Sequence, residues 1–414
     1  MDPSLNHIAP YTENQVRETL IWLETSKDFI RGVQFFYPDW KEEAIISKLR
    51  TCNTCAEFQV HFIEMIIKNS IRKTMDSLEI SGLDTLDNSN NLYISNHRDI
   101  FLDSALLQNH LYDIGQPFTE ISLGDNLMVN ETMKAVAKMN SMFTVFRTGS
   151  KSELLKNTSE LSRYLRYSIR EKKVSSWLAQ NNGRTKDGND ITAPGLIKML
   201  LLSGSDNLKE SLEELNIVVS TISYEYEPCA FEKAYELSMI DKEGTYKKKH
   251  FENINSIING INEYKGKVKL VFEKLDVNNI CFTNNRKKDV LEIAKEINSI
   301  IYRNYQLWKT NYMAHDLLYN DNKYKSFYNW DEMDKFRTYL TRASNKDVYY
   351  RLLKIYVNHK IMEKLLALQK QRGVRALPQK IISRPLLELI MMLGNHVIFV
   401  TADLVGRTAY VIGV

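Results

Sequence analysis

The chain has 414 residues, of which 43% are hydrophobic and 26% are charged. This length and balance predict a folded protein with a sizeable core, and they exclude wholesale disorder. The formal net charge is only +4, which is too small to indicate a nucleic-acid-binding protein, so we expect no nucleic-acid partner. A locally basic face could still bind anionic substrates or lipids.

Residues 1–75 have the pattern of a helical N-terminal region. Thr12 followed by Gln15 resembles a capping box, and the apolar residues Val16 and Leu20 follow it at helical spacing. Residues 58–67 again have helical apolar spacing. We expect helices here, preceding the main domain.

Residues 76–284 alternate short apolar runs with longer amphipathic stretches, which is typical of an α/β domain. We predict strands near residues 91–95, 117–123, 142–146, 174–179, 217–224 and 267–272. The segment 152–172 has the length and charge of a surface helix. The predicted fold class is therefore α/β, with a mostly parallel sheet covered by helices.

Residues 285–414 read as a helical C-terminal region, with amphipathic segments at 290–302 and 349–368. No run approaches the roughly 18 apolar residues of a membrane-spanning helix. The nearest, residues 389–402, is interrupted by Asn395 and His396 and fits a buried helix better.

The four cysteines do not indicate a metal site. Cys52 and Cys55 have CxxC spacing, but Cys229 and Cys281 offer neither matching spacing nor nearby histidines. We expect reduced, structural thiols and no metal. The N-terminus lacks the basic start and apolar core of a signal peptide, so a cytoplasmic location is expected.

The stretch from Asn91 to Asp103 carries the strongest chemical signal. A short apolar strand runs into Asn96, His97, Arg98 and Asp99, and Asp103 follows. Histidine titrates near neutral pH and can take a proton from an alcohol, while a carboxylate can orient the imidazole. These residues suggest a general base, although a histidine after a strand is more often structural.

Two later strand ends carry cations suited to binding a phosphate. Arg147 ends the apolar run that begins at Phe143, and a glycine turn contains Asn182, Gly183, Arg184 and Lys186. A guanidinium offers paired donors, and glycine lets backbone amides approach an anion. A surface arginine and an ordinary loop are the alternatives.

In their order and intervals these stretches resemble the glycerolipid acyltransferase family, which includes glycerol-3-phosphate and 1-acylglycerol-3-phosphate acyltransferases. The resemblance rests on Asn96-His97 with Asp103, Phe143 to Arg147, Asn182-Gly-Arg-Thr185 and Ile217 to Pro228, and its context is similar to a bacterial branch. It covers about residues 10–360, leaving an unmatched tail.

This chain departs from the family's blocks at three places. His97 and Asp103 are six positions apart rather than five, so the pairing needs a bulged turn or Asp99 substitutes. Asn182 stands where the family has glutamate. Thr185 stands where the family has arginine, so the phosphate contact would shift to Arg184 or Lys186.

The resemblance implies acyl transfer from an acyl thioester, on coenzyme A or acyl carrier protein, to a hydroxyl of a phosphorylated glycerol in phospholipid synthesis. It implies His97 as the general base and Asp103 as its orienting carboxylate. It implies Arg147 and Arg184 as phosphate ligands near Gly183, with Lys186 as a further candidate. No cofactor is expected beyond the donor substrate. The alternatives are an amine or amino-acid lipid acceptor, and a catalytically weakened membrane-associated relative.

A lipid product implies peripheral association with the inner face of the membrane. The tail offers one candidate surface, because basic residues precede the apolar run at 386–400, and a packed C-terminal helix is the alternative reading. The basic residues are Lys360, Lys364, Lys370 and Arg372.

Overall fold

A computed structural model describes residues 2–86, 89–249, 251–283 and 285–357, and the backbone of residues 399–402 and 409–412. Residues 1–362 form one compact unit and residues 363–414 form a second. In the second unit, β8 (Phe399–Ala402) pairs with β9 (Ala409–Ile412) in antiparallel fashion. The predicted divisions near residues 75 and 284 stay predictions.

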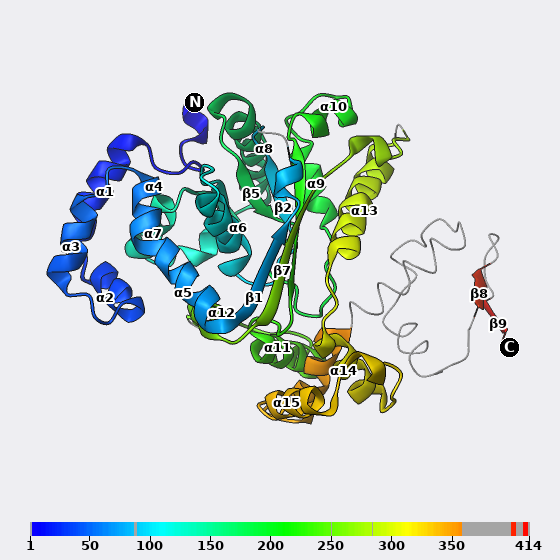
Figure 1. Ribbon diagram of the computed structural model, residues 1–414. Coiled ribbons are helices and arrows are strands. Elements are labelled where there is room, and N and C mark those ends of the chain that lie inside the picture. The colour runs from blue at the N-terminus through cyan, green and yellow to red at the C-terminus, as the bar shows by residue number, and fades with distance from the viewer. Residues whose placement is uncertain are drawn as a thin grey trace. The chain divides into compact units, whose positions relative to one another are not determined.

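The first unit contains a seven-stranded sheet in the order β1-β7-β6-β2-β5-β3-β4 (Figure 1). All neighbouring strands are parallel except β6 and β7, which are antiparallel. The predicted α/β class with a mostly parallel sheet is therefore confirmed. The strands are β1 (Met75–Ser81), β2 (Leu92–Ser95), β3 (Glu120–Gly124), β4 (Met142–Val145), β5 (Ser176–Ala179), β6 (Ile217–Tyr224) and β7 (Gly266–Lys274).

Helices cover both faces of the sheet. The side chains of Leu92 and Ile94 pack in one core with α8, α9 and α13, while Tyr93 packs on the other face with α5 and α6. This alternation follows from the two-residue period of a strand, and burial on both faces explains why the strand is apolar throughout. These helices are α5 (Met65–Thr74), α6 (Leu102–Asp113), α8 (Lys151–Tyr167), α9 (Pro194–Leu200) and α13 (Arg286–Asn304).

The N-terminal helices form a layer of their own beside α5 and α7 (Figure 1). Thr12 and Gln15 make the predicted capping box, and Val16, Leu20 and Leu23 are buried in a separate core. The elements are α1 (Glu13–Thr25), α2 (Lys27–Phe36), α3 (Glu42–Arg50), α4 (Cys55–Phe58), a π-helical stretch (Gln59–Glu64) and α7 (Glu131–Met139).

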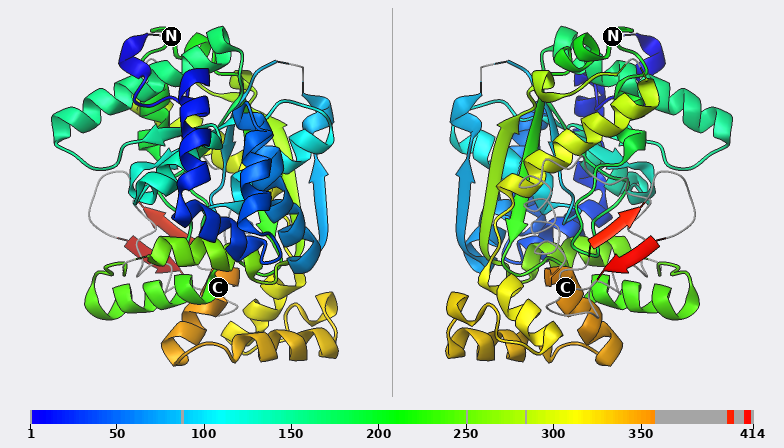
Figure 2. Two further views of the ribbon diagram at one scale, coloured as in Figure 1. Left: turned by 90° about the vertical axis from the view of Figure 1, so that its left-hand side faces the viewer. Right: turned by 90° about the vertical axis from the view of Figure 1, so that its right-hand side faces the viewer.

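The helices α11, α14 and α15 gather at one end of the sheet, which Figure 2 shows from two sides. They share a core with residues 346–357, which are also helical. The remaining helices are α10 (Leu208–Glu213), α11 (Ala230–Glu243), α12 (Glu252–Asn262), α14 (Lys309–Tyr319) and α15 (Trp330–Leu340).

Two sequence predictions about secondary structure were wrong. Strand β1 was missed, because it is a sheet-edge strand whose residues after Met75 are mostly exposed or half-buried and lack an apolar run. Residues 389–402 were expected to be helical, yet the last four form strand β8. The rest of that segment, the remainder of the helix expected to residue 368, and the basic tail residues lie outside the described residues.

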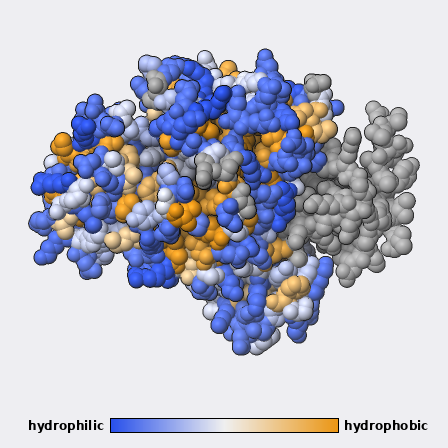
Figure 3. Space-filling view, turned by 45° about the horizontal axis from the view of Figure 1, so that its top comes forward, coloured by the Kyte–Doolittle hydropathy of each residue, from blue (hydrophilic) through white to orange (hydrophobic). Residues whose placement is uncertain are grey.

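Among the described helices, none has the length and apolarity needed to cross a membrane. On the face shown in Figure 3, hydrophobic residues gather in patches separated by hydrophilic surface.

Candidate active site

His97 lies two residues after the end of the central strand β2. Its Nδ1 lies 3.0 Å from Oδ2 of Asp103, and its side chain is 11% exposed. Within the described part of the chain, this is the one hydrogen bond of the imidazole. When Nδ1 carries the proton and donates it to Asp103, Nε2 keeps its lone pair and can accept a proton from another molecule.

Asp103 lies in the first turn of α6 and is fully buried. Its Oδ2 also accepts hydrogen bonds from the backbone N–H groups of Arg98, at 2.6 Å, and Asp99, at 2.8 Å. Its Oδ1 accepts one from the Tyr224 hydroxyl at 3.1 Å. The turn after His97 therefore wraps around the carboxylate, which accommodates the six-residue interval.

Asp99, the alternative partner for His97, points elsewhere. Its Oδ1 accepts from the N–H groups of Phe101 and Leu102, each at 2.8 Å, and so holds the entry to α6. Its Oδ2 is buried without a hydrogen-bond partner and lies against Gly260, where a Cβ would overlap the carboxylate. Burial, and then the charge of Asp103, raise the pKa of the Asp99 carboxyl.

Asn96 and Arg98 are buried and hold the strand ends together. The Asn96 amide exchanges two hydrogen bonds with the backbone of Ile222 on β6, at 2.8 and 3.0 Å. Arg98 forms ion pairs with Asp190 at 2.7 Å and Glu227 at 3.0 Å. Because their polar atoms are engaged by the protein, both residues position the site instead of facing a ligand.

The glycine turn is tied directly to His97. Gly183 has a φ of +110°, a backbone conformation that residues with a Cβ rarely adopt. Two residues later, the N–H of Thr185 donates to the His97 carbonyl at 2.7 Å, and its hydroxyl donates to Asp190 at 2.9 Å. Thr185, which stands where the family has arginine, is thus a buried structural residue.

Arg184 and Lys186 leave this turn in different surroundings. Arg184 donates from Nη2 to the Ser256 hydroxyl at 3.2 Å, and its Nη1 is buried without a hydrogen-bond partner. Lys186 forms an ion pair with Glu236 of α11, so part of its charge is balanced. Asn182 is exposed, and its N–H donates to the side chain of Asn181.

Arg147 is farther from His97 than the other predicted residues. It follows β4, which is separated from β2 by β5 and β3, a distance of roughly 14 Å at ordinary strand spacing. Its Nε lies over Gly124, where a Cβ would come within 2.7 Å. Its backbone N–H donates to Asp125 at 3.2 Å. It therefore flanks the edge of the sheet that carries His97 without adjoining the histidine.

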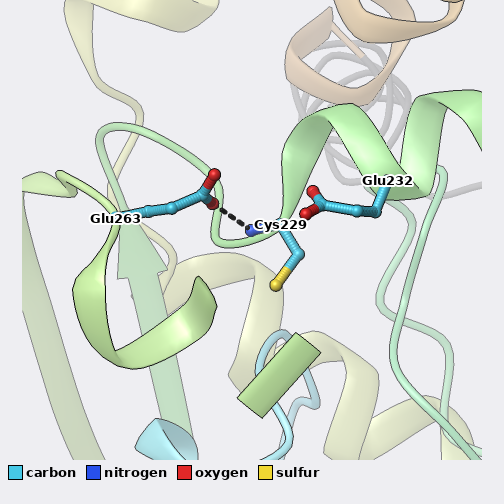
Figure 4. A group of neighbouring side chains, drawn as sticks. All are labelled: Cys229, Glu232 and Glu263. Atoms are coloured by element: carbon cyan, nitrogen blue, oxygen red, sulfur yellow. Dashed lines mark hydrogen bonds between the residues drawn. The ribbon is translucent and has the colours of Figure 1, made fainter. Parts of the chain in front are cut away.

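Cys229, Glu232 and Glu263 bring three potential metal ligands within 4.8 Å of one another (Figure 4). The chemistry of this group does not favour a metal. Burial raises the pKa of the Cys229 thiol to about 12, and its Sγ donates to the Ser256 carbonyl. Glu263 accepts the Cys229 N–H at 3.1 Å and pairs with Arg342. The thiol Sγ and the Glu263 carboxylate are thus both engaged by groups of the protein.

Two contributors were not assigned from the sequence. Tyr224 lies within the stretch Ile217 to Pro228, for which only a supporting role was expected, and Asp190 was not singled out. Asp190 binds Arg98 and Tyr224 binds Asp103, and each pair is separated by more than 90 residues along the chain. A polar residue at the end of an apolar run was the only signal for Tyr224, and Asp190 had none.

The chain matches no protein-family model and no curated protein sequence. Among solved structures it is similar to the 1-acyl-sn-glycerophosphate acyltransferase PlsC from Thermotoga maritima, with 15% identity, 69% of this chain and 97% of that chain covered, and a TM-score of 0.34. It is also similar to chloroplast FtsY from Physcomitrella patens, with 12% identity, 68% and 96% covered, and a TM-score of 0.18. TM-scores this low do not establish a common fold.

Proposed function

We propose that this protein is an O-acyltransferase of phospholipid synthesis. It would move a fatty acyl group from a thioester of coenzyme A or acyl carrier protein to a hydroxyl of glycerol 3-phosphate or 1-acylglycerol 3-phosphate. The observation that carries the proposal is the His97–Asp103 pair at the carboxyl end of β2. A buried carboxylate on Nδ1 leaves Nε2 available as a general base.

In this mechanism the acceptor hydroxyl gives its proton to Nε2 of His97 as its oxygen attacks the thioester carbonyl. The new C–O ester bond forms and the C–S bond breaks. The proton then passes from His97 to the departing thiolate, which leaves as the free thiol. Because a thioester is already activated, no covalent acyl-enzyme is needed. Asp103 stabilises the imidazolium formed between the two proton transfers.

The surroundings of His97 support binding of a phosphate. Arg184 directly precedes the buried residue Thr185, and its Nη1 has no hydrogen-bond partner among the described residues. Thr185 ties this turn to the His97 carbonyl, so the arginine is held beside the proposed base. Since the product would be a lipid, we further propose that the protein works at a membrane surface from the cytoplasm, as a peripheral protein.

The test is acyl transfer by purified wild type and by His97→Ala, with labelled oleoyl-CoA and a panel of acceptors. The panel contains glycerol 3-phosphate, 1-oleoylglycerol 3-phosphate and an amino-acid lipid. We expect product only with the phosphorylated glycerols, and a loss of at least about 100-fold in His97→Ala. The control is His110→Ala, which alters a histidine of α6 and should keep wild-type activity. Near-normal transfer by a folded His97→Ala variant would overturn the assignment.

A further inference from the structure

Lys233 is a buried lysine that takes no part in the proposed mechanism. It is the fourth residue of α11, and its side chain is 1% exposed. Its Nζ donates to the carbonyl of Arg98 at 2.6 Å and to Oε1 of Glu227 at 2.6 Å. An ammonium group from α11 therefore reaches the turn that follows His97.

This lysine completes the fixing of one peptide group in the turn. The N–H of Asp99 donates to Oδ2 of Asp103 at 2.8 Å, and the carbonyl of Arg98, in the same planar peptide group, accepts from Lys233. Loss of the lysine would free the carbonyl end of this group to tilt. Because the Asp99 N–H and Nδ1 of His97 bind the same oxygen of Asp103, such a tilt alters the position of the carboxylate relative to the imidazole.

The charges around Lys233 are balanced in the protein interior. Arg98 pairs with Asp190 at 2.7 Å and with one oxygen of Glu227 at 3.0 Å. Lys233 pairs with the other oxygen of Glu227. All four side chains are at most 4% exposed. Two cations and two carboxylates thus form a buried network, and removal of one member leaves a charge uncompensated.

The place of Lys233 is unfavourable for a lysine. Lysine is almost never fully buried unless it is paired, and a cation near the start of a helix faces the positive end of the helix dipole. Replacement of a buried ion pair by apolar residues is often neutral or stabilising. Stability therefore gives no reason for an ammonium group here, whereas its contact with the turn after His97 does.

We propose that Lys233 is a positioning residue: its ammonium group holds the turn and so keeps the Asp103 carboxylate aligned with the imidazole of His97. The inference rests on the proposed function and adds to it a residue that the sequence did not indicate. Because Lys233 is buried and bound to protein groups, it acts through the catalytic pair and not by touching a substrate.

The kinetic test compares Lys233→Met with wild type. We expect kcat to fall about 10-fold and the KM values of donor and acceptor to stay within about twofold, because a contact of the turn is lost and not a substrate contact. Lys242→Met is the matched control. It alters another lysine of α11, which is 52% exposed and paired with Asp347, and should keep the wild-type kcat. A folded Lys233→Met variant with wild-type kcat would overturn the inference.

A double variant separates the lost hydrogen bond from the lost charge, and it also serves if Lys233→Met does not fold. Lys233→Met leaves Arg98 facing two carboxylates. The added Glu227→Gln leaves only Asp190, so the network is neutral again. We expect the double variant to regain stability in urea unfolding while its kcat stays about 10-fold below wild type. Recovery of the wild-type kcat would show that Lys233 only balances charge, and it would overturn the positioning role.

A spectroscopic test needs no turnover and separates this inference from the proposed function. The Nδ1 proton of His97, donated to the buried Asp103 carboxylate, should give a proton NMR resonance downfield of the amide protons in cooled solution. Its absence in His97→Gln assigns it. We expect it to shift or broaden in Lys233→Met and to stay unchanged in Lys242→Met. A changed resonance supports the inference even if no acceptor is acylated, and an unchanged one overturns it even if acyl transfer occurs.

Discussion

The Tyr224 hydroxyl, at the end of β6, donates a hydrogen bond to Oδ1 of Asp103, in the first turn of α6, at 3.1 Å. The other oxygen of that carboxylate receives Nδ1 of His97 and two backbone N–H groups. Both oxygens of the orienting carboxylate are thus held by the protein. These hydrogen bonds fix the position of the Asp103 carboxylate relative to the imidazole, so that its negative charge faces His97.

The assignment of Asp103 over Asp99 can be tested by the same substitution at both positions. Asp103→Asn removes the charge that orients His97, and we expect transfer to fall about 100-fold or more. Asp99→Asn keeps an oxygen for the N–H groups of Phe101 and Leu102, so activity should stay within about threefold. Steady-state rates of both folded variants give the answer, and the reverse order would identify Asp99 as the functional carboxylate.

Tyr224→Phe tests the role of the tyrosine as a positioning residue. The change leaves Oδ1 of Asp103 without its donor, and we expect kcat to fall about 10-fold with KM unchanged. In an Asp103→Asn background the same change should cost less than about threefold, because the two residues act through one interaction. Equal losses in both backgrounds would show that Tyr224 acts independently of Asp103.

The buried position of Tyr224 also leads to a prediction about how the transfer rate depends on pH. Burial, and then the charge of Asp103, raise the pKa of Tyr224 well above the usual tyrosine value. The hydroxyl therefore keeps its proton and its hydrogen bond in alkaline solution. The pH–rate profiles of wild type and Tyr224→Phe should therefore have the same shape in alkaline solution. An alkaline decline in wild type that Tyr224→Phe lacks would contradict this expectation.

Gly260→Ala should disturb the turn that carries the catalytic pair. The added Cβ would overlap the buried carboxylate of Asp99, and we expect the free energy of unfolding to fall by about 1–3 kcal/mol. Gly195→Ala is the matched control, since no atom lies within 4 Å of its Cβ position and alanine favours its helix. Urea unfolding of both variants measures the difference. A Gly260→Ala variant as stable as wild type would contradict this close approach.

The burial of Lys138 leads us to expect that the free energy of unfolding depends on pH. Its buried ammonium donates to the carbonyls of Ile8 and Ala9 and to the Thr144 hydroxyl. Burial lowers its pKa to about 8, whereas an unfolded lysine titrates near 10.4. Between these values the unfolded chain binds more protons, so the free energy of unfolding rises with pH.

The measurement compares urea unfolding of wild type and Lys138→Met at pH 8 and pH 9. The variant should be less stable at both values, because three acceptors lose their donor. The advantage of wild type should grow by about 1 kcal/mol over this interval. The other titrating groups contribute equally to wild type and to Lys138→Met, so they cancel when the two unfolding free energies are subtracted. If this difference is the same at pH 8 and pH 9, Lys138 does not titrate in that interval.

The α/β class and all six predicted strands followed from local patterns, with starts and ends within about three residues of those observed. An apolar run with a polar residue at its end identifies a buried parallel strand, because both of its faces are covered. Strand β1 was not predicted, because a half-exposed edge strand needs no such apolar run. The hydrophobic period also placed α8 and α13 correctly.

The order of residues already showed that a histidine and two carboxylates follow an apolar strand, and that Arg184 lies in a glycine turn. Which of the two carboxylates binds the imidazole depended on the fold, because the path of the turn after His97 is set by packing against α6 and β6. It also decided that Asn96 and Arg98 are buried among partners from distant segments. It brought Ser256 to Arg184, 72 positions earlier in the chain, since long-range packing, and not local spacing, determines which polar groups meet.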